Sequence, residues 1–287
     1  DVDWNAPTTM QNEGSGSAEE SNLGADHAHE AELSDLTPGK SYAYRVGDGS
    51  LSGWSRTHIT TIEDGSRDTL VFAVHGDTRS DYEMWRRVMT ATSATDPDFI
   101  VNVGDIVADG REMGDWNRWF YEAKDLLPVY PYMTVLGNHE RQAREYFTSL
   151  ALPTNAEPDS MDEQWYSFDH GPTHWVALNS CVAVKQQREW LERDLAANTK
   201  PWVFVYYHHP LYAGHVSRGD GNAALREEWG DLFDQYDVAI AWQGHDHYYF
   251  RTKSIEDNEV VEDGQGTIYL TAGGGGAGIY DPMKNRW

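Results

Sequence analysis

The chain has 287 residues, 39% of them hydrophobic, and a formal net charge of −25 at pH 7. This length is enough for one large domain, or for a medium domain with a small one. Acidic residues outnumber basic ones by 47 to 22. Because phosphate backbones and anionic lipid surfaces attract Lys and Arg, this balance argues against nucleic acid as a partner. No apolar run approaches the roughly 18–20 residues of a membrane span. The chain shows no signal peptide, but a mature protein or a fragment would not show one either.

The excess of negative charge has two interpretations. A salt-adapted protein stays soluble where dissolved ions screen its self-repulsion, but an ordinary acidic extracellular enzyme can carry a similar balance. Cys181 is the single cysteine, so no intrachain disulfide forms. It follows an apolar run at residues 175–178, and no activating base lies near it in sequence. We therefore expect a buried structural thiol rather than a nucleophile.

The first part of the chain predicts a small β-rich unit. Residues 11–22 are rich in Gly, Ser and Glu, which predicts a mobile loop. Tyr42, Tyr44 and Val46 alternate with other residues, which predicts a half-buried strand with these three on one face. A second strand is expected over residues 57–62. Residues 63–66, Glu-Asp-Gly-Ser, predict a linker.

Beyond the linker, apolar runs typical of buried strands alternate with helical patterns. Strands are expected over residues 69–74, 99–103, 133–136, 202–207, 238–242 and 267–271, and helices over 82–89 and 187–195. This alternation predicts an α/β domain. In open α/β sheets, ligands gather where the strands end at their carboxyl side.

Five segments place metal-binding side chains directly after apolar runs. They are His75-Gly76-Asp77-Thr78-Arg79, Gly104-Asp105, Gly137-Asn138-His139-Glu140, His208-His209-Pro210 and Gly244-His245-Asp246-His247. Carboxylate and amide oxygens mixed with imidazoles suit Zn, Mn or Fe. Two such ions about 3.5–4 Å apart can hold the attacking and leaving oxygens of a phosphoryl transfer. The set therefore predicts a two-metal hydrolase.

The order GD, GD, GNHE, HxP, GHxH resembles the calcineurin-like metallophosphoesterases, most closely their purple acid phosphatase branch. This resemblance implies a four-layer α/β/β/α sandwich over residues 66–287. The string L-x-P-G-x-x-Y-x-Y-R-V-G, from Leu36 to Gly47, resembles the fibronectin type III-like domain that precedes the catalytic domain of purple acid phosphatases. Residues 1–65 are too few for a full sandwich of about 100 residues, so we expect a partial domain that lacks its first strands.

The resemblance implies six metal ligands, which are Asp77, Asp105, Asn138, His208, His245 and His247. Asp77 and His247 would serve the first ion, and Asp105 would bridge the pair. The other three would serve the second ion. His209 remains an alternative to His208, less favoured because the family's pattern is His, any residue, Pro. A single Asp after a strand usually caps a turn, but six matching residues in this order favour a site.

Three further residues are candidates for contact with the substrate. Arg79 stands where most metallophosphoesterases have a histidine ligand; it would clamp a phosphate with its planar guanidinium, or form a salt bridge with a carboxylate of the site. His139 would assist the leaving group, as in the family, or make a structural hydrogen bond at its turn. His215 loosely resembles the substrate-contacting histidine of purple acid phosphatases.

Ala108 stands where purple acid phosphatases have a tyrosine that binds ferric iron, so we expect a colourless protein. By either pattern, the first metal site has thus lost a side-chain ligand, and Asp109 or His75 could compensate. His170 is expected outside the metal shell. The run 273–276 is not a nucleotide-binding loop, because no Lys-Ser/Thr follows it.

Together these features predict a metal-dependent, acid phosphatase-like phosphoesterase with two divalent ions of Mn, Zn or Fe. A metal-bound hydroxide would attack phosphorus while His139 assists departure. The substrate would be a small-molecule or lipid phosphate ester. The alternatives are a phosphodiesterase or phospholipase of the same fold, and a catalytically weak cell-surface binding module. The resemblance also implies an extracellular or cell-surface location.

Overall fold

The computed structural model describes residues 21–23, 26–28, 33–47, 53–66, 69–281 and 287. The chain divides into two compact units, Asp1–Arg67 and Asp68–Trp287. The first unit contains β1 (Ser21–Leu23), β2 (Asp26–Ala28), β3 (Ser41–Tyr44) and β4 (His58–Thr61). The second contains β5 (Phe72–His75), α1 (Tyr82–Ser93), β6 (Phe99–Asn102), α2 (Met113–Ala123), β7 (Tyr132–Thr134), α3 (Arg144–Ser149), η1 (Asp159–Met161), β8 (Tyr166–His170), β9 (Thr173–Ala177), α4 (Val184–Ala197), β10 (Trp202–Tyr206), η2 (Val216–Arg218), α5 (Ala223–Leu225), η3 (Arg226–Gly230), α6 (Asp231–Gln235), β11 (Val238–Gln243), β12 (Tyr249–Glu256), β13 (Glu259–Val260) and β14 (Thr267–Ala272).

In the first unit, β3 and β4 form an antiparallel pair in which Ser41 lies opposite Thr61. Tyr42 and Tyr44 are half-buried while their neighbours are exposed, so the predicted alternation is confirmed. Val46, expected on the same face, is 67% exposed because the strand ends at Tyr44. Of the predicted loop, residues 11–20 lie outside the described residues, and Ser21–Leu23 pairs with β2. The fibronectin type III-like identity of this unit stays a prediction.

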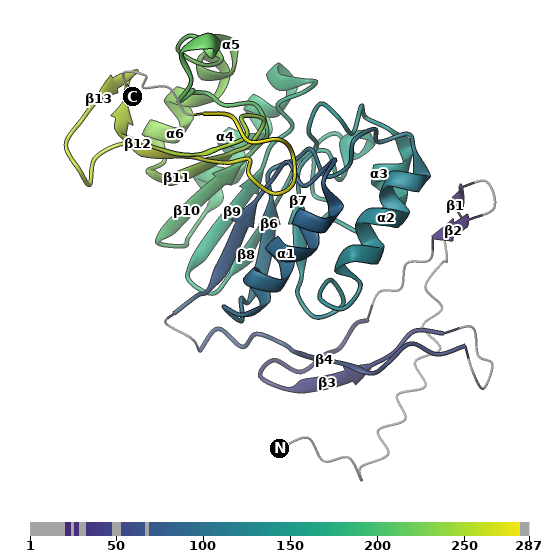
Figure 1. The fold of residues 1–287 in the computed structure, drawn as a ribbon. Coiled ribbons are helices and arrows are strands. Elements are labelled where there is room, and N and C mark those ends of the chain that lie inside the picture. The colour runs from purple at the N-terminus through teal and green to yellow at the C-terminus, as the bar shows by residue number, and fades with distance from the viewer. Residues whose placement is uncertain (1–20, 24–25, 29–32, 48–52, 67–68, 282–286) are drawn as a thin grey trace. The chain divides into compact units, whose positions relative to one another are not determined.

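The second unit contains two sheets (Figure 1). The smaller has the order β5-β6-β7, with parallel neighbours. The larger has the order β13-β12-β14-β11-β10-β9-β8. Its four central strands are parallel, and β12 and β8 flank them in antiparallel pairings. The predicted mixed α/β fold is thus confirmed.

Alternate side chains of the larger sheet face two different layers. The ring of Trp175 lies 4.8 Å from that of Phe72, which brings β9 against β5 of the smaller sheet. Val176, next to Trp175, points the other way into a core that includes Leu191 of α4 and Phe233 of α6. This alternation follows from the two-residue period of a strand. It buries both faces of the sheet, as its near-continuous apolar sequence predicts.

Helices α1 and α2 pack against the smaller sheet and share one hydrophobic core with it. Trp85 of α1 stacks on Trp119 of α2, with ring centroids 5.1 Å apart, and both are fully buried. The succession is therefore helices, small sheet, large sheet, helices. The strands and helices predicted from residue 69 onward are found with end shifts of at most four residues. Among the described residues, no helix is long and apolar enough to cross a bilayer.

Helix α2 was not predicted. Its start at Met113 has no side-chain cap, because Glu112 makes no capping hydrogen bond. The usual signal for a helix N-terminus is therefore missing from the sequence. Its buried residues Trp116, Trp119 and Ala123 nevertheless recur at helical spacing, which is the signal that could have identified it.

Candidate metal centre

The five sequence segments follow the carboxyl ends of β5, β6, β7, β10 and β11, so both sheets contribute to one site. Three of the predicted ligands have left-handed backbones, namely Asp77 (φ 54°), Asp105 (φ 54°) and His245 (φ 66°). Such conformations are uncommon for residues other than glycine and concentrate at functional sites. Gly104, with φ 92°, has no such cost, and a Cβ there would lie 2.8 Å from the backbone nitrogen of Gly137. The close approach of these loops therefore requires a glycine.

Glu140 joins two of the loops, a role that the sequence analysis missed. Its carboxylate is fully buried and accepts hydrogen bonds from the amides of Gly137 (2.6 Å), Asp105 (3.0 Å), Ile106 (2.7 Å) and Val107 (3.2 Å). Burial, together with the charge of Asp105, raises the pKa of Glu140 to about 7 despite these donors. Its place in the GNHE segment was the only sequence signal.

The first cluster consists of Asp77, Asp105 and His247, whose ligand atoms lie within 4.8 Å of one another. Oδ1 of Asp77 is buried, lies 3.3 Å from Nε2 of His247 and accepts no hydrogen bond. Nδ1 of His247 lies 2.8 Å from the carbonyl of Gly278 and must donate to it. Nε2 then keeps its lone pair, which is the arrangement of a metal-binding imidazole. Burial raises the pKa of Asp77, because the buried carboxylate loses its hydration.

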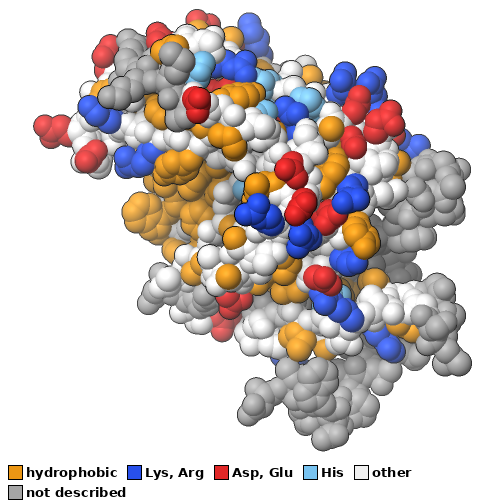
Figure 2. Space-filling model, viewed as in Figure 1, with side chains coloured by type: hydrophobic (Ala, Val, Ile, Leu, Met, Phe, Trp, Pro, Cys, Tyr) orange, Lys and Arg blue, Asp and Glu red, His pale blue; other side chains and the backbone are white. Residues whose placement is uncertain are grey.

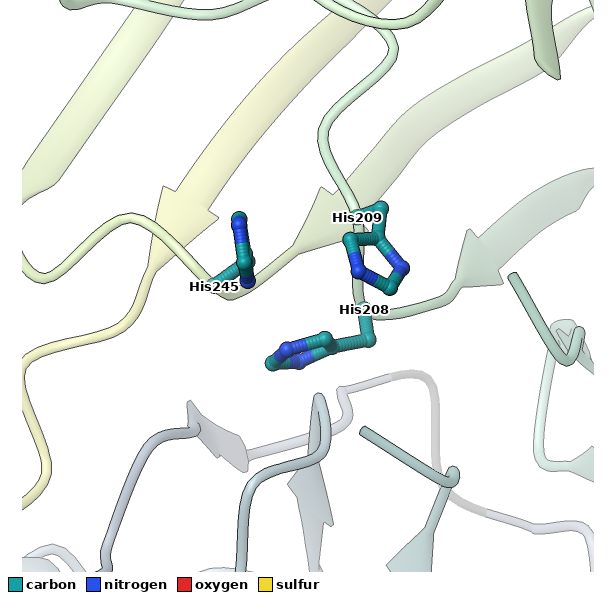
Figure 3. A group of neighbouring side chains, drawn as sticks. All are labelled: His208, His209 and His245. Atoms are coloured by element: carbon teal, nitrogen blue, oxygen red, sulfur yellow. The ribbon is translucent and has the colours of Figure 1, made fainter. Parts of the chain in front are cut away.

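The second cluster contains His208, His209 and His245 (Figure 3), whose ligand atoms also lie within 4.8 Å of one another. Oδ1 of Asn138 lies 3.1 Å from Nε2 of His208 and 3.0 Å from Nδ1 of His245. Nδ1 of His208 donates to the carbonyl of Val103 at 2.9 Å, so Nε2 is the nitrogen that faces Asn138 and Asp105. Although burial acts to lower the pKa of His208, the carboxylates of Asp105 and Asp77 raise it overall. Burial lowers the pKa of His245 to about 3, which keeps that imidazole neutral.

His209 remains an alternative ligand, since the structure brings it into the second cluster. Its Nδ1 lies 3.1 Å from Oγ of Ser180, which offers a hydrogen bond to that nitrogen. Cys181 lies next to it, with Sγ 3.9 Å from the same nitrogen. The cysteine is partly rather than fully buried, and burial raises its pKa well above the usual range. This agrees with an unreactive thiol.

The spacing within and between the clusters suits metal coordination. Bonds of about 2.0–2.2 Å, set at tetrahedral or octahedral angles, place neighbouring ligand atoms about 2.8–3.6 Å apart. The pairs Asp77–His247 and Asp105–His208 are each 3.3 Å apart, and the pairs of Asn138 are 3.0 and 3.1 Å apart. Together with the unpaired oxygen of Asp77, the donor set fits two cations.

Arg79 forms a salt bridge in the site, as one of its two interpretations predicts. Its Nε lies 3.2 Å from Oδ2 of Asp105, and its Nη2 lies 3.3 Å from Nε2 of His247. Asp105 therefore has a cation beside it. Although burial acts to raise the pKa of Asp105, His208, the amide of His139 and Arg79 hold it below its usual value. The role of Arg79 as a phosphate clamp stays a prediction.

His139 is oriented by a backbone contact. Its Nδ1 lies 2.6 Å from the carbonyl of Ala108, so it donates there and leaves Nε2 free. That Nε2 lies 3.8 Å from Oδ2 of Asp105, and the side chain is 27% exposed. Ala108, singled out for the tyrosine it replaces, thus contributes its carbonyl oxygen. The contact with Ala108 therefore fixes the His139 ring with Nε2 on the side of Asp105.

His215 lies in neither cluster. With Ser217, Arg218 and Tyr280 it lines a cavity of about 310 Å³. The ring of Tyr280 stacks on that of His247 at 4.4 Å, so the cavity borders the first cluster. Nε of Arg218 bonds Asp246 at 3.0 Å, which attaches this loop to the last motif. Figure 2 shows several histidine side chains at the upper edge of the view next to Lys or Arg side chains.

The residues considered as compensating ligands have other partners. Asp109 pairs with Arg111 at 2.8 Å and with Arg141 at 3.2 Å. His75 places Nε2 2.8 Å from the hydroxyl of Tyr132. Neither belongs to the two clusters, so the structure does not support their compensating role. The glycine run at residues 273–276 packs beside the first cluster, where the amide of Gly275 donates to the carbonyl of Gly76.

His170 also lies outside both clusters, as predicted. Its ring packs against Phe99 at 5.1 Å.

Comparisons with known proteins agree with this geometry. The chain is 29% identical to acid phosphatase type 7 of Mus musculus, over 82% of this chain and 59% of the mouse protein. It is 26% identical to purple acid phosphatase 15 of Arabidopsis thaliana, over 86% of this chain and 53% of that protein. It therefore spans little more than half the length of these relatives.

The fold is shared with a solved structure. Purple acid phosphatase PPD1 from yellow lupin seeds superposes with a TM-score of 0.75 at 22% identity, over 88% of this chain and 53% of the lupin chain. The family described as calcineurin-like phosphoesterase matches residues 70–249, which include all six predicted ligands. The chain belongs to the calcineurin-like phosphoesterase family.

Proposed function

We propose that this chain hydrolyses phosphate esters with two divalent metal ions, as an acid phosphatase-like phosphoesterase. One observation carries the proposal: six side chains, predicted from five separate segments, form two adjoining clusters at ligand spacing. Family membership and the acid phosphatases among the relatives support it.

Asp105 is the proposed bridge between the two ions. Its Oδ1 lies 3.3 Å from Nε2 of His208, in the second cluster. Its Oδ2 faces Arg79 and His139 on the side of the first cluster. Asp77 and His247 would complete the first site. Asn138, His208 and His245 would complete the second, with His209 as the alternative there.

Two divalent ions at these positions would lower the pKa of a water nucleophile and neutralise charge on the phosphoryl oxygens. The chain's own residues hold and orient the substrate. When the imidazole of His139 carries a proton on both nitrogens, its Nε2–H would protonate the departing oxygen, while Nδ1–H donates to the carbonyl of Ala108. The cavity beside Tyr280 would accept the rest of the ester, where His215 can contact it.

The substrate class proposed is a small-molecule or lipid phosphate ester. A phosphodiesterase or phospholipase would use the same ligands, so monoester and diester substrates are compared in the test. The binding-module alternative gains no support, because Oδ1 of Asn138 lies within 3.1 Å of both Nε2 of His208 and Nδ1 of His245, a spacing that suits a metal site. Salt adaptation and an extracellular or cell-surface location stay predictions.

The test measures hydrolysis of p-nitrophenyl phosphate and of bis-p-nitrophenyl phosphate by protein loaded with Mn²⁺, Zn²⁺ or Fe²⁺. We expect a metal-dependent activity that chelation removes. His208→Ala should abolish it, and the matched control His170→Ala should keep it, because His170 lies outside both clusters. Activity that survives both chelation and His208→Ala would refute the proposal.

A further inference from the structure

All three guanidinium nitrogens of Arg79 are engaged at the first cluster. Nε contacts Asp105 (3.2 Å), Nη2 contacts Nε2 of His247 (3.3 Å), and Nη1 contacts Oγ of Ser80 (3.3 Å). The side chain is 19% exposed. Two of these contacts go to the same atoms that the proposed function assigns to the first ion.

One of the contacts excludes a metal bond. Nδ1 of His247 donates to the carbonyl of Gly278, so Nε2 has a single lone pair in the ring plane. An Nη2–H group and a cation cannot both use that lone pair. An ion at the first site must therefore displace Arg79 from His247. A cation at that position also meets the positive charge of Arg79 at short range, which opposes its binding.

The second cluster has a different arrangement. Nε2 of His208 and Nδ1 of His245 both lie against Oδ1 of Asn138, at 3.1 and 3.0 Å. An amide oxygen and two imidazole nitrogens are all potential ligands, and an ion between them replaces no arginine contact. Arg218, whose charge acts on His245, is bonded through Nε to Asp246.

We propose that Arg79 competes with the first ion for His247 and Asp105, so that the two sites differ in affinity. The second site binds its ion tightly. The first site binds weakly, and its ion releases the guanidinium, which can then bind phosphate oxygens. This inference rests on the proposed function, because it uses the same two ligand sets. Under this inference, Arg79 forms the salt bridge when the first ion is not bound and contacts phosphate when it is bound, so both interpretations of this side chain hold.

The experiment titrates chelator-treated protein with Mn²⁺ by isothermal calorimetry. Electron paramagnetic resonance then reports whether bound Mn²⁺ is isolated or coupled to a second ion. The wild type should show one tight site and one at least tenfold weaker. Arg79→Ala should raise the affinity of the weak site about 10- to 100-fold, the value of a hydrogen bond from a charged donor, and leave the tight site unchanged. Arg79→Gln serves as a second variant if the alanine variant folds poorly.

Arg188→Ala is the matched control. Arg188 lies on α4, and its guanidinium pairs with Asp231 at 2.6 Å. The substitution therefore removes one positive charge without changing a contact of either cluster. It should leave both affinities unchanged. Equal affinities in the wild type, or a weaker first site in the Arg79 variants, would overturn the inference but keep the proposed function. Failure of the wild type and of Arg188→Ala to bind any ion would overturn both.

Discussion

Replacing Glu140 by glutamine should test how the loops of the metal centre are held. Oε2 accepts from the amides of Gly137 and Asp105, and Oε1 accepts from those of Ile106 and Val107. Glutamine keeps one oxygen and presents an NH₂ group in place of the other. Two buried N–H groups therefore lose their acceptor, at a cost of about 1–3 kcal/mol each, or about 2–6 kcal/mol in total. This is a large part of a typical unfolding free energy of about 5–15 kcal/mol.

The assay is urea denaturation with chelator present, because a bound ion would stabilise the folded state by itself. Metal affinity should also fall about 10- to 100-fold, since Asp105 and Asn138 lose the support of their loops. Glu189→Gln, an exposed change on α4, is the control and should leave both quantities unchanged. A loss below about 1 kcal/mol with unchanged metal binding would refute this account of Glu140.

Three further predictions concern leaving groups, salt and pH. His139→Asn should slow alkyl phosphates by about 10²–10⁴-fold but nitrophenyl phosphates far less, because only a basic leaving group needs a proton; equal losses would remove the general-acid role. The melting temperature should rise from low to molar salt, since screening relieves a net charge of −25; a flat curve would favour an ordinary acidic protein. Burial acts to lower the pKa of His174, but its hydrogen bonds to Asp194 and Asp169, both 2.8 Å, raise it overall. The stability this provides is present below about pH 6.5 and lost as pH rises through the raised pKa, so His174→Gln should destabilise the protein more at pH 6 than at pH 9.

The order of elements and the loops that carry the ligands could be predicted, because each strand is a short apolar run that ends at a polar motif. Asp77 and His247 are far apart in sequence, and their meeting follows only from two sheets whose carboxyl ends adjoin. The family resemblance supplied that pairing. Local patterns could not, since periodicity describes one element at a time.

Other features of the site depend on tertiary contacts that leave no local signal. Glu140 binds backbone amides, which every residue has, so its role cannot be identified from residue type. Asp109 was a reasonable compensating ligand by position, but Arg111 and Arg141 pair with it instead. Tyr280 reaches His247 from a segment that follows the last strand and carries no motif. The engagement of Arg79 likewise required the positions of both Asp105 and His247.

The central claim is that two ions bind between these side chains. Anomalous diffraction from crystals grown with excess Mn²⁺ locates such ions directly. The account predicts two peaks about 3.5–4 Å apart, one beside Asp77 and His247 and one beside His208 and His245, with Asp105 between them. Absence of a peak at both positions, or peaks only at surface carboxylates, would contradict it.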